Sequence, residues 1–313
     1  AFSDRGTDTI LKTRAKLASM RFTRGLLIFG LASMIMFVST GAFVYYNSNV
    51  INNYATSDTR QDQQEQYERQ LKKFQDRPQP RVVESILAVD IYPYSRSFGI
   101  NGHYIMKNKT PYPLDTLFIQ LPTQDEMSFE KLVFSSQDSS WEGDAIIAQN
   151  YEEFDFIIYE LSPALQPGDS MKFEFEGQFL TRGFKESGTG NSQIVNNGTF
   201  FDTRYFPAIG YEPTLELTSD DERKKRDLPY RERSRPIDDS VGLRTNLIGD
   251  AADNVRFEAT MSSTSDQIAF APGYLEKTWT EGDRKYYHYK MDIPMFNFYS
   301  LISARYERLQ EDW

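Results

Sequence analysis

The chain has 313 residues, a formal net charge of −10 at pH 7 and no cysteine. The absence of cysteine excludes disulfides, thiolate metal sites and a cysteine nucleophile, so core packing must stabilise the folded part. The acidic balance argues against nucleic-acid binding, which needs a basic face to neutralise phosphates. We therefore expect no nucleic-acid partner.

The chain begins with a basic arm, residues 1–24, which precedes a stretch without charged side chains, residues 25–46. As a helix this stretch rises about 33 Å, which is enough to cross a hydrocarbon core of about 30 Å. We predict one transmembrane helix here. The residues that we expect to mark the membrane anchor are Gly25, Leu31, Phe37, Tyr45 and Tyr46.

The charges on the two sides of residues 25–46 predict the orientation. Basic residues dominate the arm, whereas no basic residue follows the stretch until Arg60. By the positive-inside rule the N-terminus is cytoplasmic, so we expect a bacterial inner-membrane protein with a periplasmic β domain. A cleaved signal peptide is the first alternative, although the apolar run exceeds the usual 7 to 15 residues. A buried core helix is the second, and it would show a polar stripe with helical period.

Residues 47–81 are predicted to form a juxtamembrane helix and a linker. The polar run 55–77 places Tyr67, Leu71 and Phe74 on one narrow apolar stripe, at positions i, i+4 and i+7. Proline residues at the end of the run stop the helix. The stripe indicates docking on the adjacent domain rather than a partner-binding helix.

Residues 82–313 are predicted to form an extracytoplasmic antiparallel β-sandwich. Short runs rich in Ile, Phe, Tyr and Val are separated by turn signals, and residues 171–176 alternate strictly between apolar and polar. The chain therefore reads as mainly β. The predicted strands are residues 85–93, 102–107, 115–121, 145–149, 154–161, 171–180, 255–261, 267–271, 275–279, 284–291 and 298–306.

A charged insertion, residues 219–239, separates the two sets of strands and contains both signs of charge in equal number. One interpretation is a loop that docks a regulatory partner. A run of mixed sign is more typical of a solvated loop or short helix whose charges pair with one another, and we favour that interpretation.

Residues with catalytic potential are few. His103 and His288 each lie in a predicted strand and lack the partners that a zinc hydrolase needs, namely three protein ligands around an activated water. Glu152, Glu153 and Asp155 are close in sequence, as is common where a strand starts. We therefore predict no catalytic, cofactor-binding or metal-binding residue in this chain.

Motifs of the β region occur in a distinctive order. They are residues 168–169 before 172–177, Asp202-Thr203-Arg204-Tyr205-Phe206-Pro207 before Glu212-Pro213, and then 257–261, 270–275 and 291–305. This order resembles the N-terminal domain of M1-family zinc aminopeptidases. The resemblance implies a β-sandwich that leads into a catalytic domain.

Further motifs lie around the predicted span and along the β region, at residues 43–54, 66–69, 79–80, 90–93, 197–201, 206–211 and 216–217. Together they resemble bacterial proteins in which an ABC-transporter-type permease is fused to an M1-like module. The resemblance implies that residues 25–46 are the last permease helix. It also implies as partners the membrane, other transporter subunits or the rest of the same polypeptide, and a peptide substrate.

Departures from the family limit what the resemblance implies. A Gln or Glu upstream of the family's Arg-x-Phe-Pro element helps to hold the substrate amine, but here the stretch reads Asn196-Asn197-Gly198. The Gly-Ala-Met-Glu-Asn loop and the His-Glu-x-x-His helix do not occur in the 313 residues. We therefore expect no cofactor in this chain, with zinc only in a catalytic domain outside it, and no peptide cleavage by this chain alone.

Two functions follow as expectations. In the first, the chain is part of a permease and peptidase fusion, and its β domain positions and walls a peptide-binding cleft. In the second, it is a non-catalytic, membrane-tethered interaction module of a transporter or envelope complex.

Overall fold

The computed structural model describes residues 11–20, 23–124, 126–136, 138–185, 193–231, 236–240, 252–307 and 309. The chain forms two compact units. The first contains Ala1–Tyr54 together with Gly183–Gly188, and the second contains Ala55–Arg182 with Thr189–Trp313.

The first unit is helical. Helix α1 spans Leu11–Met20, helix α2 spans Arg24–Tyr45, and a π-helical segment, η1, continues α2 over Tyr46–Ile51. Thr23 caps α2, because its hydroxyl accepts a hydrogen bond from the backbone N–H of Leu26 at 3.3 Å. The predicted span thus lies within one residue of α2 at either end.

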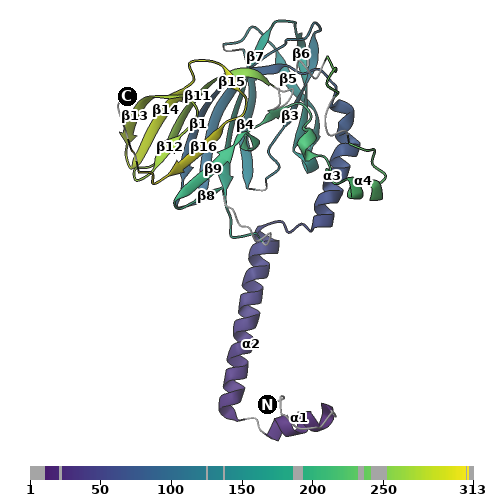
Figure 1. The fold of residues 1–313 in the computed structure, drawn as a ribbon, viewed down its shortest axis with the longest axis vertical. Helices are drawn as coiled ribbons and strands as arrows, with labels where there is room; N and C mark the ends of the chain where they lie inside the picture. The colour runs from purple at the N-terminus through teal and green to yellow at the C-terminus, as the bar shows by residue number, and fades with distance from the viewer. Residues whose placement is uncertain are drawn as a thin grey trace. The chain divides into compact units, whose positions relative to one another are not determined.

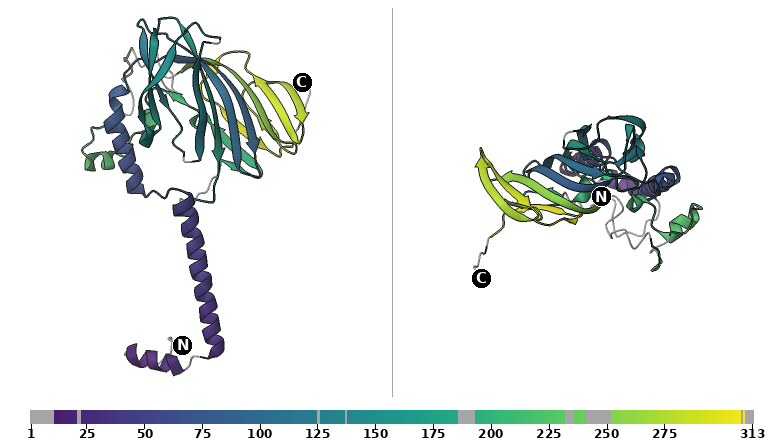
Figure 2. Two further views of the ribbon diagram at one scale, coloured as in Figure 1. Left: turned by 180° about the vertical axis from the view of Figure 1, so that it is seen from behind. Right: turned by 90° about the horizontal axis from the view of Figure 1, so that it is seen from above.

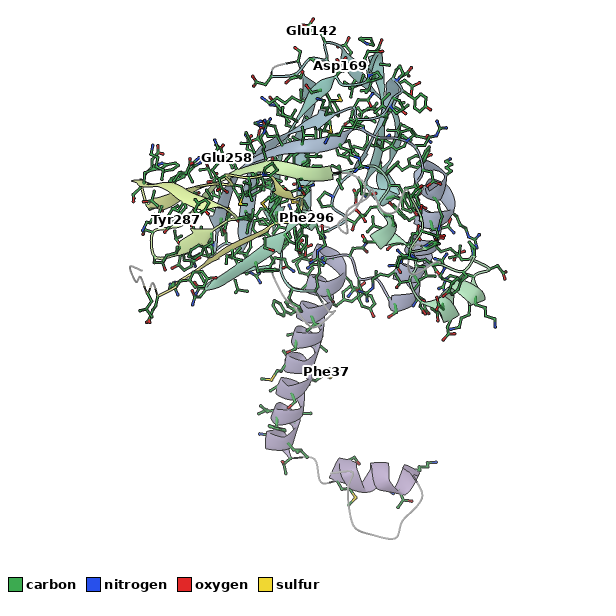
Figure 3. All side chains as sticks on the ribbon, turned by 45° about the horizontal axis from the view of Figure 1, so that its top comes forward. Phe37, Glu142, Asp169, Glu258, Tyr287 and Phe296 are labelled. Atoms are coloured by element: carbon green, nitrogen blue, oxygen red, sulfur yellow. The ribbon has the colours of Figure 1, made fainter. Side chains whose placement is uncertain are left out.

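Helix α2 buries none of its side chains in the chain's own core. Four of the predicted anchor residues, Gly25, Leu31, Phe37 and Tyr45, lie on α2, and Tyr46 begins η1. Phe37 is 79% exposed, and its side chain projects from the ribbon in Figure 3. The continuous helix Arg24–Ile51 is long and apolar enough to cross a membrane. A signal sequence near the N-terminus would have the same properties, whereas a core helix would be buried.

A cluster at the C-terminal end of α2 joins two parts of the chain that are distant in sequence. We call Asn47, Asn52, Gly183 and Phe184 the clasp. The side-chain amide of Asn52 donates to the carbonyl oxygens of Asn47, at 2.8 Å, and Phe184, at 3.2 Å. The ring of Phe184 lies 5.8 Å from that of Phe43. Gly183 has a φ of 55°, and a Cβ there would overlap the Asn47 side-chain oxygen.

Replacing Gly183 by alanine should open the clasp without unfolding the chain. The added methyl group overlaps Asn47, and a left-handed backbone costs a residue other than glycine about 1–2 kcal/mol. Hydrogen–deuterium exchange of residues 181–185 should accelerate about 5- to 30-fold. Gly168→Ala is the control, because Gly168 also has positive φ but no atom near its Cβ position. Unchanged exchange in Gly183→Ala would mean that the clasp does not hold this segment.

The second unit begins with helix α3, which spans Ser57–Leu71 and continues as a 3₁₀ turn, η2, over Lys72–Phe74. Thr56 caps α3 by accepting a hydrogen bond from the N–H of Thr59 at 3.1 Å. The predicted stripe is confirmed as a docking face: Tyr67, Leu71 and Phe74 pack against the aromatic and aliphatic side chains Phe118, Phe154, Phe156 and Ile158. Figure 1 shows α3 beside the small sheet that carries β3, β5 and β6.

The remainder of the second unit is β structure, as predicted. The large sheet has the order β13 (Tyr274–Glu281), β14 (Arg284–Lys290), β11 (Ala252–Thr264), β1 (Arg81–Tyr92), β2 (Ser97–Lys107), β7 (Ser170–Leu180) and β4 (Met127–Ser135), with β15 (Met295–Phe296) on β11. The strands of this sheet twist relative to one another (Figure 2).

Two smaller sheets complete the sandwich. One has the order β10 (Ala208–Ile209), β3 (Leu114–Gln120), β6 (Phe156–Leu165) and β5 (Asp144–Tyr151). The other has the order β12 (Ile268–Phe270), β16 (Ser300–Ala304), β9 (Gly198–Asp202) and β8 (Ile194–Val195). A single core unites residues of all three sheets, for example Phe175 of the large sheet with Leu117 and Phe201 of the small ones.

The register of β7 follows the predicted alternation. Phe173, Phe175 and Phe179 point into the core, whereas Glu176 and Gln178 are exposed. Side chains of one face share an environment because successive residues of a strand point to opposite faces.

The strand pairing differs from the prediction in one respect. The sheets are antiparallel as predicted except for β1 and β11, which pair in parallel, Ser85 opposite Phe257 and Val89 opposite Met261. A parallel pair needs a long crossover connection, which the strands and helices between β1 and β11 provide.

Several strands were missed. Strand β4 contains Glu130 and Lys131, and a bulge in its pairing with β7 falls between Phe129 and Lys131. The bulge interrupts the alternation that would have revealed the strand. The other missed strands, β8, β9, β10 and β15, have between two and five residues, which is too short for a clear pattern.

Candidate functional site

The two histidines lie on strands, as predicted. His103 is on β2, and burial together with nearby Lys172 lowers its pKa. His288 is on β14, with its Nε2 at 3.3 Å from Glu258 and 3.6 Å from Glu276. Within the described residues, no group of three or more His, Cys, Asp or Glu side chains is placed to hold a metal ion.

The carboxylates at 152–155 are not brought together as an acid–base pair. Glu152 and Glu153 are exposed on the 3₁₀ turn η3, Glu152–Phe154, and Asp155 follows with a φ of 53°. The side chain of Glu153 accepts a hydrogen bond from Gln70 of α3 at 3.2 Å. These residues form the turn before β6.

A buried ion pair joins α3 to the charged insertion. Within residues 219–239 the structure describes helix α4, Asp220–Lys225, which confirms the predicted short helix. Arg223 of α4 donates two hydrogen bonds to Glu68 of α3, at 2.6 and 2.7 Å, and both side chains are 2% exposed. The charges of the insertion were predicted to pair with one another, and for Arg223 this was wrong.

The surroundings of this pair satisfy the remaining donors. Arg223 also donates to the carbonyl oxygens of Leu217, at 2.7 Å, and Pro229, at 2.7 and 2.9 Å. Lys72 donates to Glu68 at 2.8 Å. Burial favours the neutral form of Glu68, but the hydrogen bonds from Arg223 and Lys72 outweigh it, so the pKa of Glu68 is lowered. This network fixes α4 and the segment after it to α3.

The lowered pKa of Glu68 predicts how stability changes in acid. A carboxylate with a folded-state pKa below its ordinary 4.5 stabilises the fold above that pH, and the contribution is lost as the pH falls through the folded-state value. The stability gap between the native chain and Glu68→Gln should therefore be largest above pH 4.5 and shrink below it. Urea unfolding of the full chain in detergent as a function of pH measures this gap.

The matched control is Glu160→Gln, which changes an exposed carboxylate of β6. Its gap to the native chain should stay nearly flat over the same pH range. A Glu68→Gln gap that stays constant or widens in acid would contradict a charge-stabilised Glu68.

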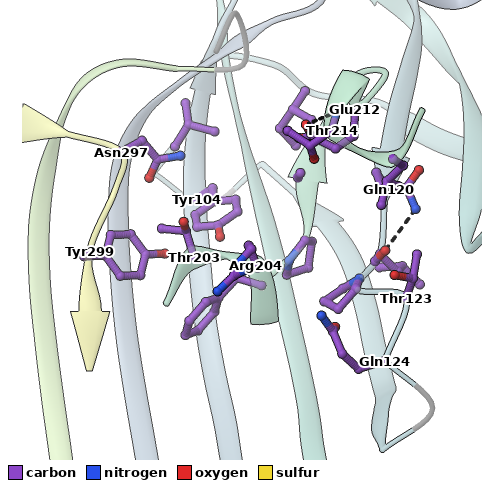
Figure 4. A pocket seen from close by; sticks show the side chains of 18 residues that line it. Tyr104, Gln120, Thr123, Gln124, Thr203, Arg204, Glu212, Thr214, Asn297 and Tyr299 are labelled. Atoms are coloured by element: carbon purple, nitrogen blue, oxygen red, sulfur yellow. Dashed lines mark hydrogen bonds between the residues drawn. The ribbon is translucent and has the colours of Figure 1, made fainter. Parts of the chain in front are cut away.

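A cavity of about 200 Å³ lies in the second unit and is the strongest candidate for a binding site. Five segments form it: the end of β3 with the loop to residue 124, η4 and the residues after it to β10, the turn 212–215, β1 with β2, and residues 297–299. Figure 4 shows their labelled side chains converging from different elements.

One wall of the cavity is polar. Gln120, which is 4% exposed, donates to the carbonyl oxygens of Phe154 at 2.8 Å, Leu121 at 3.0 Å and Asp155 at 3.2 Å. These three acceptors fix the orientation of the amide, and its oxygen has no partner in the described chain. Buried polar atoms usually have partners, so an unpaired oxygen beside a cavity requires explanation.

Two further amide oxygens of the cavity wall are in the same state. The side-chain oxygens of Gln124 and Asn297 are buried, and neither has a hydrogen-bond partner among the described residues. Of the charged groups, Arg204 is already engaged with Asp202, to which it donates at 2.9 to 3.2 Å. The wall thus offers more acceptors than donors.

Hydroxyl groups line the opposite side. Tyr299 is buried and lies 3.5 Å from the hydroxyl of Ser85. Burial raises the pKa of Tyr299 to about 12, so it remains a neutral hydrogen-bonding group. Burial also raises the pKa of Tyr104, which interacts with Tyr299. These tyrosines can orient a polar ligand but cannot act as bases near neutral pH.

Sequence reasoning assigned no binding role to any of these residues. Arg204, Phe206 and Pro207 nevertheless belong to a motif quoted for the family resemblance, and this motif lines the cavity. Gln120, Asn297 and Tyr299 come from strands or loops far apart in sequence, so no spacing could have grouped them. The Asn196-Asn197 stretch lies elsewhere, where Asn197 accepts a hydrogen bond from the N–H of Arg305 at 2.8 Å.

Comparison with known proteins gives structural likeness only. No family model matches the chain, and no curated protein matches its sequence. Among solved structures, an M1 zinc metallopeptidase from Deinococcus radiodurans is similar, with 11% identity over 74% of this chain and a TM-score of 0.44. A mutant of that enzyme with bound Tyr-Ser-Ala substrate gives 12% identity, 74% coverage and a TM-score of 0.42.

A two-domain M1 zinc metallopeptidase mutant bound to L-tryptophan is also similar, with 11% identity over 74% of this chain and a TM-score of 0.42. The matched region spans 43 to 44% of the length of these three structures. Likeness at this level says nothing about activity.

Proposed function

We propose that this chain is a membrane-anchored module of a bacterial inner membrane, with its N-terminus in the cytoplasm and its β unit in the periplasm. The single observation that carries the proposal is α2, a helix of 22 residues that is apolar along its whole length and buries no residue. An exposed surface of this size is costly in water and stable in lipid. The basic residues before α2 support the orientation.

The absence of cysteine makes a direct topology test possible. Thr13→Cys places a thiol on the exposed surface of α1, and Thr280→Cys places one on the exposed strand β13. In intact spheroplasts a membrane-impermeant maleimide should label Thr280→Cys alone, and after permeabilisation it should label both. Labelling of Thr13→Cys alone would reverse the proposed orientation.

The same samples distinguish the anchor from a signal sequence. If α2 is a cleaved signal, mass spectrometry of the mature protein will show that the arm and α2 have been removed, and the β unit will be soluble. If α2 is the anchor, the arm is retained and the protein stays in the membrane fraction after a carbonate wash.

We further propose that the β unit positions and walls a peptide-binding cleft within a longer permease and peptidase fusion. The order of motifs that resembles such fusions supports this proposal, and so does the cavity beside Arg204 and Phe206. The intact mass of the native protein, extracted from its own membrane, tests it. A mass well above 36.3 kDa is expected for the fusion. A mass near that value would exclude it.

A non-catalytic interaction module is the second candidate, and the edge of the large sheet favours it. Strand β13 ends the sheet and has a partner, β14, on one side only. Its Tyr274 and Leu275 are exposed, and Trp279 stacks on Tyr286 with ring centroids 5.0 Å apart. Apolar side chains on a free strand edge are typical of surfaces that add a partner strand. Recovery of a stable partner with the native protein, at a mass near 36.3 kDa, would favour this function.

A further inference from the structure

We propose that the cavity of the second unit binds an organic cation, with a primary ammonium group held by the Glu212 carboxylate and an apolar stem lying along the opposite wall. All lining residues belong to the second unit, so the inference is independent of the membrane topology proposed above. The ammonium group can belong to a free alkylamine or to a lysine side chain of a peptide. The second source would specify the peptide class of the proposed cleft.

Glu212 supplies the charge. Its Oε1 accepts hydrogen bonds from the N–H of Thr214, at 3.2 Å, and the hydroxyl of Thr214, at 2.8 Å. Its Oε2 accepts none from the described residues, and no described lysine or arginine forms an ion pair with it. A carboxylate with one free oxygen at a cavity wall is suited to a cationic donor.

The position of Glu212 is fixed from below. Its backbone N–H donates to the hydroxyl of Tyr67 at 3.0 Å, and the ring of Tyr67 stacks on that of Tyr211 at 5.1 Å. Tyr67 is 3% exposed and belongs to the docked face of α3. The carboxylate is therefore presented by a rigid turn, which reduces the entropy that a ligand must offset on binding.

The other polar atoms of the cavity accept rather than donate. The side-chain oxygens of Gln120, Gln124 and Asn297 are buried without a partner in the described chain. Figure 4 shows Gln124 and Asn297 on opposite sides of the cavity and Glu212 beside Thr214 above it. An ammonium group carries three donors and no acceptor, so it matches a site with an excess of acceptors.

The only cation in the cavity wall does not compete for this role. Arg204 is neutralised by Asp202, which it contacts through two nitrogen atoms. The pair leaves the cavity with the uncompensated charge of Glu212. An anionic ligand would have to displace Asp202 or face Glu212, so a cation is favoured electrostatically.

The rest of the wall is apolar and suits an alkyl stem. It includes the side chains of Pro122, Phe206, Pro207, Ile209 and Leu215. The cavity volume of about 200 Å³ equals that of about seven water molecules at 30 Å³ each. This is the size of a pentylamine chain with its ammonium group, and it is too small for a folded partner segment.

Isothermal titration of the full chain in nanodiscs tests the proposal with four probes. Cadaverine represents a free amine, and Nα-acetyl-lysine amide represents a peptide side chain without a free N-terminus. Nα-acetyl-norleucine amide and pentanoate are the neutral and anionic counterparts. We expect binding of one or both ammonium probes, at least tenfold tighter than the neutral and anionic ones.

Glu212→Gln should weaken the ammonium probes at least tenfold, because the amide keeps the oxygen that accepts from Thr214 but loses the charge. Gln124→Leu should weaken them as well, since it removes one acceptor. Glu142→Gln, an exposed change outside the cavity, should alter binding less than twofold. Thermal unfolding of each variant shows whether it is folded.

The outcomes separate the sources and the alternatives. Binding of cadaverine alone identifies a free amine as the ligand class, and binding of the lysine amide identifies a peptide. Equal binding of the norleucine amide, tighter binding of pentanoate, or no binding of either ammonium probe would overturn the proposal. None of these results depends on the intact mass or the orientation of the protein, so failure here is distinguishable from failure of the proposed function.

Discussion

Leu31→Arg should prevent stable insertion of the chain into the membrane. Leu31 lies near the middle of α2, and its side chain is exposed. An arginine at the centre of a membrane-spanning helix costs roughly 2.5 to 3.5 kcal/mol on insertion scales. The chain offers no described ion-pair partner on α2 to offset this cost, because α2 has no acidic residue.

The measurement is the fraction of protein that resists carbonate extraction from membranes. We expect a loss of tenfold or more for Leu31→Arg. Leu31→Phe is the matched control, since it changes the shape of the side chain but leaves it apolar, and it should fractionate like the native chain. Undiminished carbonate resistance of Leu31→Arg would count against α2 as the anchor.

Arg223→Met should destabilise the second unit by about 3 to 5 kcal/mol. The substitution leaves the 2% exposed Glu68 carboxylate without its two hydrogen bonds from Arg223. Removing one partner of a buried ion pair costs this much because the other charge remains desolvated. Lys72 keeps its contact with Glu68 and recovers only part of the loss. Urea unfolding of the full chain in detergent measures the change.

Two variants test the cause of this loss. In the double variant Glu68→Met, Arg223→Met, both charges are removed, so the loss should be smaller than for Arg223→Met alone. Arg256→Met breaks an ion pair with Glu84 at 2.8 Å whose arginine is 69% exposed, and it should cost less than about 1 kcal/mol. Equal effects of Arg223→Met and Arg256→Met would show that burial does not govern this pair.

The parts of the fold with a regular local pattern could be predicted from sequence. The absence of charge placed the boundaries of α2 within one residue, and the spacing of Tyr67, Leu71 and Phe74 gave the docked face of α3. Alternation revealed β7 and most other long strands. In each case the pattern is repeated over several residues of one element, so a single sequence contains enough information.

Features that depend on contacts between distant residues could not be predicted. Glu68 and Arg223 are 155 positions apart, and the mixed charges around Arg223 gave no indication of its partner. One signal was present: Glu68 lies between Tyr67 and Leu71 on the buried face of α3, where a charge needs a partner. The cavity is built from five segments, and the parallel pairing of β1 and β11 likewise joins residues that no local pattern relates.

The clasp gives the chain a second path for mechanical load. The hydrogen bond from Asn52 to the carbonyl of Phe184 spans 132 positions and closes a loop that contains α3 and strands β1 to β7. A pulling force on α2 therefore reaches the start of α3 through the main chain and the end of β7 through the clasp. Unwinding α3 alone would not release the β unit from α2, because the clasp must break before the extra chain length becomes available.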